Sequence, residues 1–331
     1  MFTPRCVAVI GTGSIGMRHL DLLRTIQGVQ PIAVPTRPSR LGELDALGYA
    51  TAKDLKAAAQ QGARLCIVAT DTGRHDSDSL AALEHGMDVL VEKPMAADAH
   101  AASRMLERAH ALRRRVFVGC VLRFSESLSL FRRLLPAVGS LHSVRIECQS
   151  YLPDWRPHRA YRDSYSASVE QGGALRDLIH EIDYAGWIFG WPQALHARVK
   201  NLGRLGIAAE EVAELTWETP TGCVVSIALD YLSRSACRRM QACGSHGTIE
   251  WDGMADGVTL RAEGVATKQW RSSQTRDEMF LLQAEAFVNA ACGGSKDLRL
   301  ACGEDGVRAL AVCDAARRSE ASRREEVVAL P

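Results

Sequence analysis

Residues Cys6–Leu20 read CVAVIGTGSIGMRHL, and this stretch decides the fold of the first half of the chain. Five strand-forming residues lead into Gly11, Gly13 and Gly16, which have the G-x-G-x-x-G spacing, and Met17–Thr25 then has helical character. Such glycines permit a tight turn, a close approach of the backbone to a pyrophosphate, and close packing of helix on strand. The strand before and the helix after favour dinucleotide binding over a merely structural glycine turn. The residues predicted to hold the phosphates are Gly11, Thr12, Gly13, Ser14, Ile15 and Gly16.

The next apolar run, Pro31–Val34, predicts the second strand, and it is followed by the sequence PTRPSR over residues 35–40. A site that prefers NAD usually places an Asp or Glu here to accept the ribose 2′-hydroxyl. This segment has no acid but has two arginines and two hydroxyl groups, which suit a 2′-phosphate. A solvated basic loop is the alternative interpretation. We therefore expect NADP(H) to be preferred, with NAD(H) possible, and the predicted contacts are Thr36, Arg37, Ser39 and Arg40.

Length and composition bound the remaining possibilities. A chain of 331 residues is long enough for two domains, and 47% hydrophobic and 24% charged residues are ordinary values for globular proteins. The net charge of +1 gives no reason to expect nucleic acid or an acidic membrane as partner. No apolar run reaches the length of about 18 residues that a spanning helix needs, and no signal peptide is recognisable.

The chain has ten cysteines, which are scattered singly and include no C-x-x-C pair. This spacing argues against a zinc site or a redox dithiol, so we expect no metal. Buried free thiols in a reducing compartment are the better interpretation, which predicts a cytoplasmic protein.

Strands and helices alternate through the first 119 residues. Such alternation indicates βαβ units and a parallel sheet, so residues 1–119 are predicted to form a Rossmann domain. The further predicted strands are Leu65–Thr70, Val89–Val91 and Val116–Gly119, and the predicted helices are Ser77–His85 and Asp98–Arg113, with Asp98 as N-cap.

The pattern changes in residues 120–331, where short strands follow one another without long helices between them. They predict an α+β domain with an open, mainly antiparallel sheet, arranged as a meander. The predicted strands are Ser143–Tyr151, Ala194–Leu202, Val212–Thr219, Cys223–Tyr231, Arg238–Cys243, Gly247–Trp251 and Val258–Ala262. The predicted helices are Arg123–Pro136, Ala174–Phe189, Arg276–Cys292 and Glu304–Ser319, of which the closing pair is expected to return towards the first domain.

Glu92, Lys93 and Pro94 directly follow the strand Val89–Val91. Ligands of doubly wound sheets bind beyond the carboxyl ends of the strands, so Lys93 is expected to project into a binding site. A lysine there could stabilise negative charge on a substrate oxygen during hydride transfer. From these residues alone, a surface lysine paired with Glu92 is an equally good interpretation.

A second group of chemically capable residues follows the glycine pair Gly172–Gly173. Asp177, His180 and Asp183 lie at three-residue intervals on the predicted helix. A histidine with a neighbouring carboxylate can accept the hydroxyl proton when an alcohol is oxidised. An ordinary solvent-facing helix is the alternative, and a metal site is disfavoured because a clear third ligand is missing.

Together these motifs resemble those of the Gfo/Idh/MocA oxidoreductases over nearly the whole chain. The resemblance rests on the glycine turn, the stretch ATDTGRH (Ala69–His75), Glu92–Pro94, Arg123 and the glycine-led helix. It implies that Lys93 and His180 are the catalytic pair with Asp177 assisting, and that the Lys93–Pro94 bond is cis. It further implies an oligomer, a homodimer or homotetramer, formed through the second sheet. The additional cofactor contacts that it implies are Ala69, Thr70, His75, Glu92, Lys93 and Pro94.

The chain departs from the family pattern at two places. Thr70-Asp71 stands where Thr-Pro is common, and Asp177 and His180 are three rather than four residues apart, which rotates Asp177 by about a quarter turn relative to His180. The loop over residues 151–165 also resembles a subgroup found with bacterial surface-sugar and nonulosonic acid pathways. Its aromatic and Arg side chains suit sugar rings and acidic groups, although they would also suit an oligomer contact. The predicted substrate residues are Arg123, Trp155, Arg156, Tyr161, Arg162, Tyr165 and Asp183.

The sequence thus predicts an NAD(P)-dependent oxidoreductase that acts on a hydroxyl or keto carbon of a sugar, sugar acid or related carbohydrate. One alternative is a redox-neutral lyase or glycosidase that uses tightly bound NAD. The other is a non-catalytic protein that senses NADP(H), which would need neither Lys93 nor His180.

Overall fold

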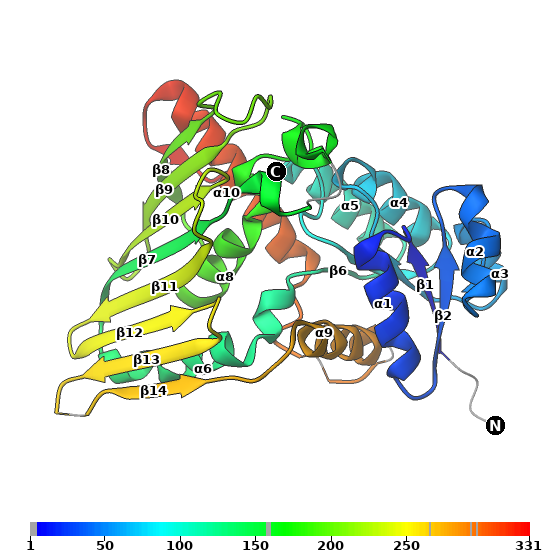
Figure 1. Ribbon diagram of the computed structural model, residues 1–331, viewed down its shortest axis with the longest axis horizontal. Coiled ribbons are helices and arrows are strands. Elements are labelled where there is room, and N and C mark those ends of the chain that lie inside the picture. The colour runs from blue at the N-terminus through cyan, green and yellow to red at the C-terminus, as the bar shows by residue number, and fades with distance from the viewer. Residues whose placement is uncertain (1–4, 157–159, 265, 292, 296) are drawn as a thin grey trace. The chain divides into compact units, whose positions relative to one another are not determined.

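The computed structural model describes residues 5–156, 160–264, 266–291, 293–295 and 297–331 (Figure 1). The chain divides into two compact units. The first comprises the chain up to Val121 together with Thr275–Val307, and the second comprises Leu122–Gln274 and Arg308–Pro331. Cys292, at the end of one predicted helix, and Pro157, in the aromatic loop, lie outside the described residues.

A six-stranded parallel sheet forms the centre of the first unit, in the order β3-β2-β1-β4-β5-β6. The order reverses between β1 and β4, and ligands of doubly wound sheets bind beyond the strand ends at such a point. The predicted Rossmann sheet is confirmed. Its strands are β1 (Arg5–Ile10), β2 (Val29–Val34), β3 (Ala50–Thr51), β4 (Leu65–Val68), β5 (Asp88–Val91) and β6 (Val116–Val118).

The helix α5 (Ala99–Ala111) begins at its predicted capping residue, whereas α4 (Thr72–Glu84) begins five residues before the predicted Ser77. The Asp98 carboxylate accepts a hydrogen bond from the backbone of Ala101 over 2.7 Å, which confirms it as an N-cap. The short elements β3, α2 and α3 were not predicted, because a strand of two residues and helices of six carry too little periodicity. The helices are α1 (Ser14–Thr25), α2 (Leu41–Ala46), α3 (Leu55–Gln60), α4 (Thr72–Glu84), α5 (Ala99–Ala111) and α9 (Arg276–Ala291).

A nine-stranded sheet forms the second unit, in the order β14-β13-β12-β11-β7-β10-β9-β8-β15. Every neighbouring pair is antiparallel except β7 and β10, which run parallel, so the predicted meander is interrupted there. The mainly antiparallel character is confirmed. The strands are β7 (Leu141–Gln149), β8 (Ala194–Lys200), β9 (Val212–Glu218), β10 (Val224–Asp230), β11 (Cys237–Gly244), β12 (Gly247–Asp252), β13 (Gly257–Ala262), β14 (Lys268–Arg271) and β15 (Glu326–Val327).

The helix predicted over Ala174–Phe189 is broken in the structure. Leu178 has φ −98° and ψ 29°, outside the helical range, and it separates α7 (Ala174–Asp177) from α8 (Ile179–Phe189). The predicted spacing of Asp177 and His180 on one continuous helix is therefore wrong. The unit also contains α6 (Glu126–Leu134) and the part of α10 (Gly303–Ser322) from Arg308 onwards.

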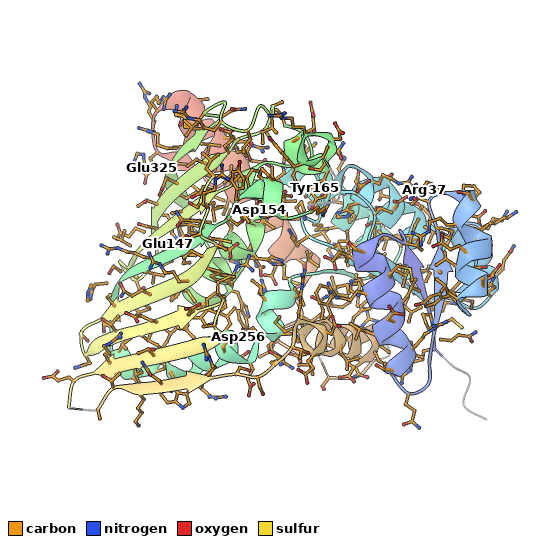
Figure 2. All side chains as sticks on the ribbon, viewed as in Figure 1. Arg37, Glu147, Asp154, Tyr165, Asp256 and Glu325 are labelled. Carbon is orange, nitrogen blue, oxygen red and sulfur yellow. The ribbon has the colours of Figure 1, made fainter. Side chains whose placement is uncertain are left out.

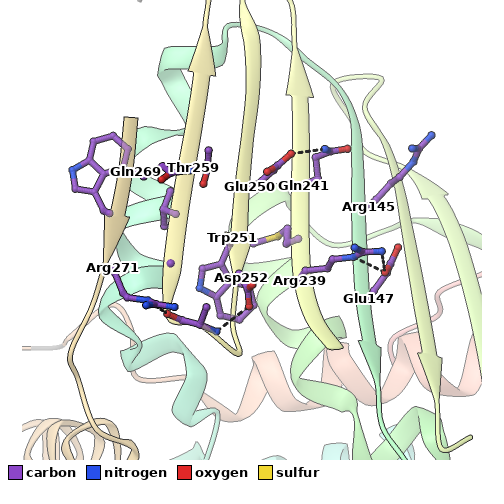
Figure 3. A pocket seen from close by; sticks show the side chains of 15 residues that line it. Arg145, Glu147, Arg239, Gln241, Glu250, Trp251, Asp252, Thr259, Gln269 and Arg271 are labelled. Carbon is purple, nitrogen blue, oxygen red and sulfur yellow. Dashed lines mark hydrogen bonds and ion pairs between the residues drawn. The ribbon is translucent and has the colours of Figure 1, made fainter. Parts of the chain in front are cut away.

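The two faces of the large sheet differ in polarity. Along β9, Ala213, Leu215 and Trp217 are buried while the alternate residues are exposed, as expected for a sheet with one covered face. Glu147 of β7, labelled in Figure 2, belongs to the polar outer face, and Figure 3 shows it beside Arg239 of β11. A hollow of about 800 Å³ is lined by residues on or next to β7, β11, β12, β13 and β14, which include charged side chains such as Glu147 and Arg239 and the aromatic side chain of Trp270.

Among the residues that the structure describes, no helix combines the length and apolar character that a membrane crossing demands.

Candidate active site

The glycine turn of the first unit has the geometry of a phosphate cradle. Gly11 has φ +88°, and a Cβ there would lie 2.6 Å from the carbonyl oxygen of Ala69. A Cβ on Gly16 would collide with the Gly11 carbonyl oxygen, whereas a Cβ on Gly13 would meet nothing within 4 Å. The turn thus packs against the end of β4 and leaves open space at Gly13, where α1 begins. These residues fit the pyrophosphate of a dinucleotide, which helix N-termini bind through free N–H groups.

The basic loop after β2 lies beside this turn. Nη1 of Arg40 donates to the carbonyl oxygen of Thr12 over 2.7 Å, and its Nη2 donates to Glu43 over 3.1 Å. Thr36, Arg37 and Ser39 are exposed, and Arg37 is labelled in Figure 2. The structure therefore brings the predicted adenosine-ribose loop and the phosphate turn together within one unit.

The carboxyl ends of β4 and β5 carry Ala69–Thr70 and Glu92–Pro94. The Lys93–Pro94 peptide bond is cis, as predicted. The Glu92 carboxylate lies 2.8 Å from Nε2 of His19, a residue of α1 that the sequence analysis did not single out. Burial alone raises the pKa of Glu92, but the hydrogen bond to His19 and the neighbouring positive charges hold that pKa below its ordinary value. Glu92 is therefore an anion held between α1 and the lysine.

His75, a predicted cofactor contact, is buried in α4. Its Nδ1 lies 2.7 Å from the carbonyl oxygen of Pro94, and its Nε2 lies 3.0 Å from that of Thr70. Both ring nitrogens thus face backbone carbonyl groups, and these contacts join the loop after β4 to the loop after β5. A direct contact of His75 with the cofactor stays a prediction.

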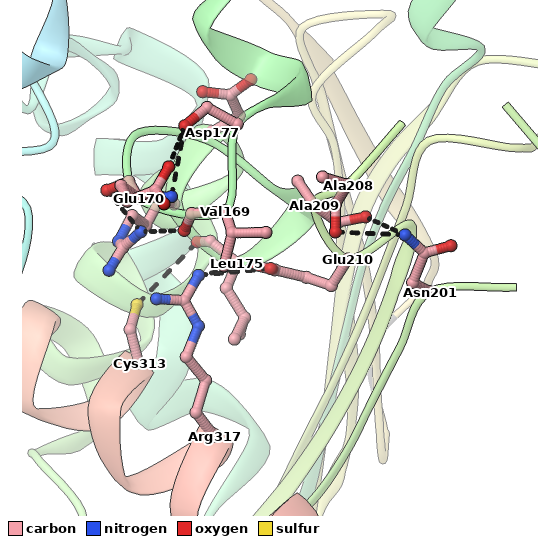
Figure 4. Close-up of polar contacts among 12 residues, drawn as sticks. Val169, Glu170, Leu175, Asp177, Asn201, Ala208, Ala209, Glu210, Cys313 and Arg317 are labelled. Atoms are coloured by element: carbon pink, nitrogen blue, oxygen red, sulfur yellow. Dashed lines mark hydrogen bonds and ion pairs between the residues drawn. The ribbon is translucent and has the colours of Figure 1, made fainter. Parts of the chain in front are cut away.

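The carboxylate of Asp177, in the second unit, accepts a hydrogen bond from Tyr231. The hydroxyl group of Tyr231 lies 2.6 Å from Oδ2 of Asp177, and both side chains are buried. Asp177 lies at the end of α7 (Figure 4), and His180 is the second residue of α8. Sequence reasoning missed Tyr231, because 54 residues separate it from Asp177 and no local pattern links the two.

Three of the predicted substrate residues gather around this pair. The ring of Trp155 packs edge-on against Tyr231 with centroids 5.3 Å apart, and the guanidinium of Arg156 lies 5.5 Å from the ring centre of Tyr165. Burial and then the charge of Asp177 raise the pKa of Tyr165 to about 12. Trp155 is thus linked to Asp177 through Tyr231, and Arg156 is linked to it through Tyr165.

The other predicted substrate residues have partners within the protein. The Tyr161 hydroxyl and Nε of Arg162 both donate to the carbonyl oxygen of Leu205 over 3.0 Å. Arg123, in the 3₁₀ turn η2 (Val121–Phe124), forms a two-pronged ion pair with Asp183 of α8 at 2.9 and 2.6 Å. Arg123 and Asp183 are 1% and 3% exposed, so this pair anchors α8 from inside the unit. Substrate contact by these four residues remains a prediction.

Within the described part of the chain, no three or more His, Cys, Asp and Glu side chains are grouped as metal ligands would be.

Comparison with known proteins matches both halves of the chain to one family. Residues 5–120 match an oxidoreductase family with an NAD-binding Rossmann fold, GFO_IDH_MocA, and residues 136–250 match the GFO/IDH/MocA C-terminal domain. Inositol 2-dehydrogenase 1 of Saccharopolyspora erythraea is 28% identical over 95% of this chain and 93% of that protein. The inositol 2-dehydrogenase/D-chiro-inositol 3-dehydrogenase of Shouchella clausii is 27% identical over 98% of this chain and 94% of its own.

Solved structures share the fold over nearly the whole length. A levoglucosan dehydrogenase in complex with NADH and levoglucosan has a TM-score of 0.86 at 17% identity, covering 98% of this chain and 99% of its own. The WlbA dehydrogenase of Bordetella pertussis, in complex with NADH and UDP-GlcNAcA, has a TM-score of 0.83 at 19% identity and covers 99% of each chain. At these identities the likeness shows the fold.

Proposed function

We propose a function from the premise that this chain belongs to the Gfo/Idh/MocA oxidoreductase family. It is an enzyme that transfers hydride between a nicotinamide dinucleotide and a hydroxyl-bearing carbon of a carbohydrate. The observation that carries the proposal is that one sheet has both a glycine turn with open space at Gly13, after β1, and Lys93, just after the end of β5. The curated relatives act on inositols by their names, and the solved neighbours bind levoglucosan and a nucleotide sugar acid, so cyclitols, sugars and sugar acids are the substrates to test.

The chain supplies an acid/base and a cation for this chemistry. His180 takes the hydroxyl proton as hydride leaves carbon, and Lys93 stabilises negative charge on the same oxygen. Asp177, held by Tyr231, supports the imidazolium form of His180 electrostatically. The nicotinamide, when bound, supplies the hydride acceptor or donor.

The preferred cofactor in this proposal is NADP(H). Between Val34 and Arg40 the chain has no carboxylate that could accept a ribose 2′-hydroxyl, and it exposes Arg37 together with the hydroxyl groups of Thr36 and Ser39. Arginine pairs with phosphate through two parallel hydrogen bonds, which favours the 2′-phosphate of NADP. NAD(H) remains the second cofactor to test, since the solved neighbours hold NADH.

The substrate half of the site is proposed to comprise Trp155, Arg156 and Tyr165. Aromatic faces stack on sugar rings, and a guanidinium binds carboxylate or phosphate groups. Two contacts support this proposal: Trp155 packs against Tyr231, which binds Asp177, and Arg156 lies over the ring of Tyr165. The charge of Asp177 in turn raises the pKa of Tyr165.

The test of the proposed function begins with fluorescence titrations of NADPH and NADH, followed by turnover assays on inositols, sugars and sugar acids. His180→Ala is expected to lower turnover by about 10²–10⁴-fold. His142→Ala, an exposed histidine on β7, is the matched control and should leave turnover unchanged. Unchanged turnover in His180→Ala would remove the assignment of the acid/base.

The same assays separate the alternatives. A redox-neutral lyase would purify with cofactor bound and convert its substrate without a net change in nicotinamide absorbance. A sensor would bind the dinucleotide and turn over none of these substrates.

We also propose that the protein forms a homodimer or homotetramer through the outer face of the large sheet. This face carries ion pairs such as Arg239–Glu147 at 2.7 Å and Arg261–Glu250 at 2.9 Å. Ala228 of β10 is a small residue on the same face. Ala228→Arg is expected to reduce the mass measured by light scattering to that of a single chain. Gln60→Arg, at an exposed position of α3, is the control, and an unchanged mass in Ala228→Arg would contradict this interface.

The proposed compartment is the cytoplasm. Cys66 and Cys313 are buried free thiols, and burial raises the pKa of Cys313 to about 12. Such thiols are stable in a reducing environment.

A further inference from the structure

Lys93 lies between two residues that are each held by a buried histidine. His19 of α1 contacts the Glu92 carboxylate at 2.8 Å, and His75 of α4 contacts the Pro94 carbonyl oxygen at 2.7 Å. The two histidines are 0% and 2% exposed. We propose that His19 and His75 are positioning residues that fix Lys93 from both sides. This inference rests on the proposed function, in which Lys93 stabilises charge on the substrate oxygen.

The contact to Pro94 has a definite direction. A carbonyl oxygen only accepts hydrogen bonds, so the shorter of the two contacts of His75, the one to Pro94, is assigned to the N–H at Nδ1. Proline has no backbone N–H, and its carbonyl oxygen is therefore the one backbone group through which it can be held. The 3.0 Å contact of Nε2 with Thr70 becomes a second donated bond when the ring takes a second proton.

The carboxylates near His75 have other partners. Asp78 pairs with Arg74 at 2.9 Å, and Glu92 is bound by His19. Burial has the larger effect and keeps the pKa of His75 below its ordinary value, although the negative charges of Glu92 and Asp78 both raise that pKa. Among the described residues, His75 forms no ion pair with a carboxylate, so the two carbonyl contacts are its direct polar interactions.

His19 holds the other flank through the contact of its Nε2 with the Glu92 carboxylate. Its ring packs edge-on against Phe280 of α9 at 5.4 Å, which leaves Nε2 directed at Glu92. Any rotation of the Glu92 or Pro94 backbone would carry Lys93 with it, because Lys93 is covalently bonded to both. A displacement of a reacting group by about 1 Å can cost about 10²-fold in rate. The two histidines thus fix the backbone from which the lysine reaches its substrate.

Turnover measurements separate positioning from direct cofactor contact. His75→Phe keeps an aromatic ring and removes the donor, and it is expected to lower kcat by about 10-fold to 10²-fold. The dissociation constant of NADPH should change less than about threefold, because in this inference the ring acts through the Pro94 carbonyl group and not through the cofactor. His75→Asn retains a donor near the position of Nδ1 and should recover part of the loss. His85→Asn, an exposed histidine just past the same helix, is the control.

A double-mutant cycle shows whether the effect passes through Lys93. In a Lys93→Met background, His75→Phe and His19→Phe should each lower the residual turnover by less than about twofold. Full additivity of either histidine with Lys93→Met would overturn its positioning role. A large rise in the NADPH dissociation constant in His75→Phe, with kcat unchanged, would overturn it in favour of a cofactor contact.

A spectroscopic measurement decides the inference even if no carbohydrate proves to be a substrate. The chain has six lysines, so protein labelled with ¹³C at the lysine ε-carbon gives few NMR signals. The signal that disappears in Lys93→Arg is that of Lys93. The Lys93 signal should shift in His75→Phe and in His19→Phe and stay in place in His85→Asn. An unmoved Lys93 signal in folded His75→Phe protein, checked by circular dichroism, would overturn the inference and leave the proposed function to be judged on turnover alone.

Discussion

The hydroxyl group of Tyr231 donates a hydrogen bond of 2.6 Å to Oδ2 of Asp177, which joins the end of β10 to the end of α7. Both side chains are buried, and burial, followed by the charge of Asp177, raises the pKa of Tyr231 well above its ordinary value. Tyr231 therefore stays protonated throughout the physiological pH range. It holds the Asp177 carboxylate in one position next to the break that begins α8.

Tyr231→Phe removes this donor while keeping the ring that packs against Trp155. Leaving a buried carboxylate oxygen without the bond should lower the free energy of unfolding by about 1–3 kcal/mol. In the proposed mechanism it should also lower kcat by about tenfold, since Asp177 would lose its fixed position. Denaturant titration and steady-state kinetics measure both quantities. Tyr151→Phe, whose ring lies under Arg234, is the control and should alter neither.

Arg37→Ala should weaken NADPH binding by at least about tenfold and leave NADH binding nearly unchanged, because only NADPH has a 2′-phosphate for the guanidinium. Fluorescence titration of both cofactors gives the ratio. Arg40→Ala is the comparison, because Arg40 donates a hydrogen bond to the Thr12 carbonyl oxygen in the phosphate turn. Its loss should weaken the binding of NADPH and NADH alike. Equal loss of NADPH and NADH affinity in Arg37→Ala would contradict the preference for NADP(H).

Removing one partner of the buried ion pair between Arg123 and Asp183 should destabilise the protein. Arg123→Leu or Asp183→Leu leaves an uncompensated buried charge, and each should lower the free energy of unfolding by about 3–5 kcal/mol. The double substitution should cost less than the sum of the singles, which a denaturant-unfolding cycle measures. Additive losses would indicate that the residues do not act as a pair. A raised substrate KM in Asp183→Asn, with stability retained, would instead support the predicted substrate contact.

The stability of the protein should fall as pH is lowered from 7 to 5, in part through His75. Burial lowers the pKa of His75 from its ordinary value of 6.5, against the opposing effect of the two carbonyl contacts. Below pH 6.5, His75 takes up a proton in the unfolded chain, whereas in the folded protein it does so only at lower pH. The free energy of unfolding therefore decreases as the pH falls. The pKa of Glu92 is lowered from 4.5, so the stability that this carboxylate contributes is lost only below pH 4.5.

His75→Asn should therefore show a smaller loss of stability between pH 7 and pH 5 than the natural protein. Urea titrations at several pH values measure this slope. His85→Asn should keep the natural slope, and an identical slope in His75→Asn would show that His75 has no depressed pKa in the folded state.

Local chemistry allowed much of the fold to be predicted from the sequence. The glycine turn, the Asp98 cap and the alternating strands depend on residues a few positions apart, so the preferences of Gly11, Asp98 and the apolar runs act over short distances. The same holds for the cis bond at Lys93–Pro94, which the family motif implied. The Rossmann unit, the mainly antiparallel second sheet and the placing of Lys93 and His180 in recognisable motifs could thus be predicted from local residue patterns.

Which polar side chains become partners depends on the folding of distant segments onto one another. Tyr231 and Asp177 are 54 positions apart, Arg123 and Asp183 are 60 apart, and His19 and Glu92 are 73 apart. No periodicity links such residues, because their contact depends on how strands and helices are stacked. The break at Leu178 also escaped prediction, since the pattern on both sides of it is helical. The sequence determined which groups can do the chemistry, and the packing of distant elements determined how each one is held.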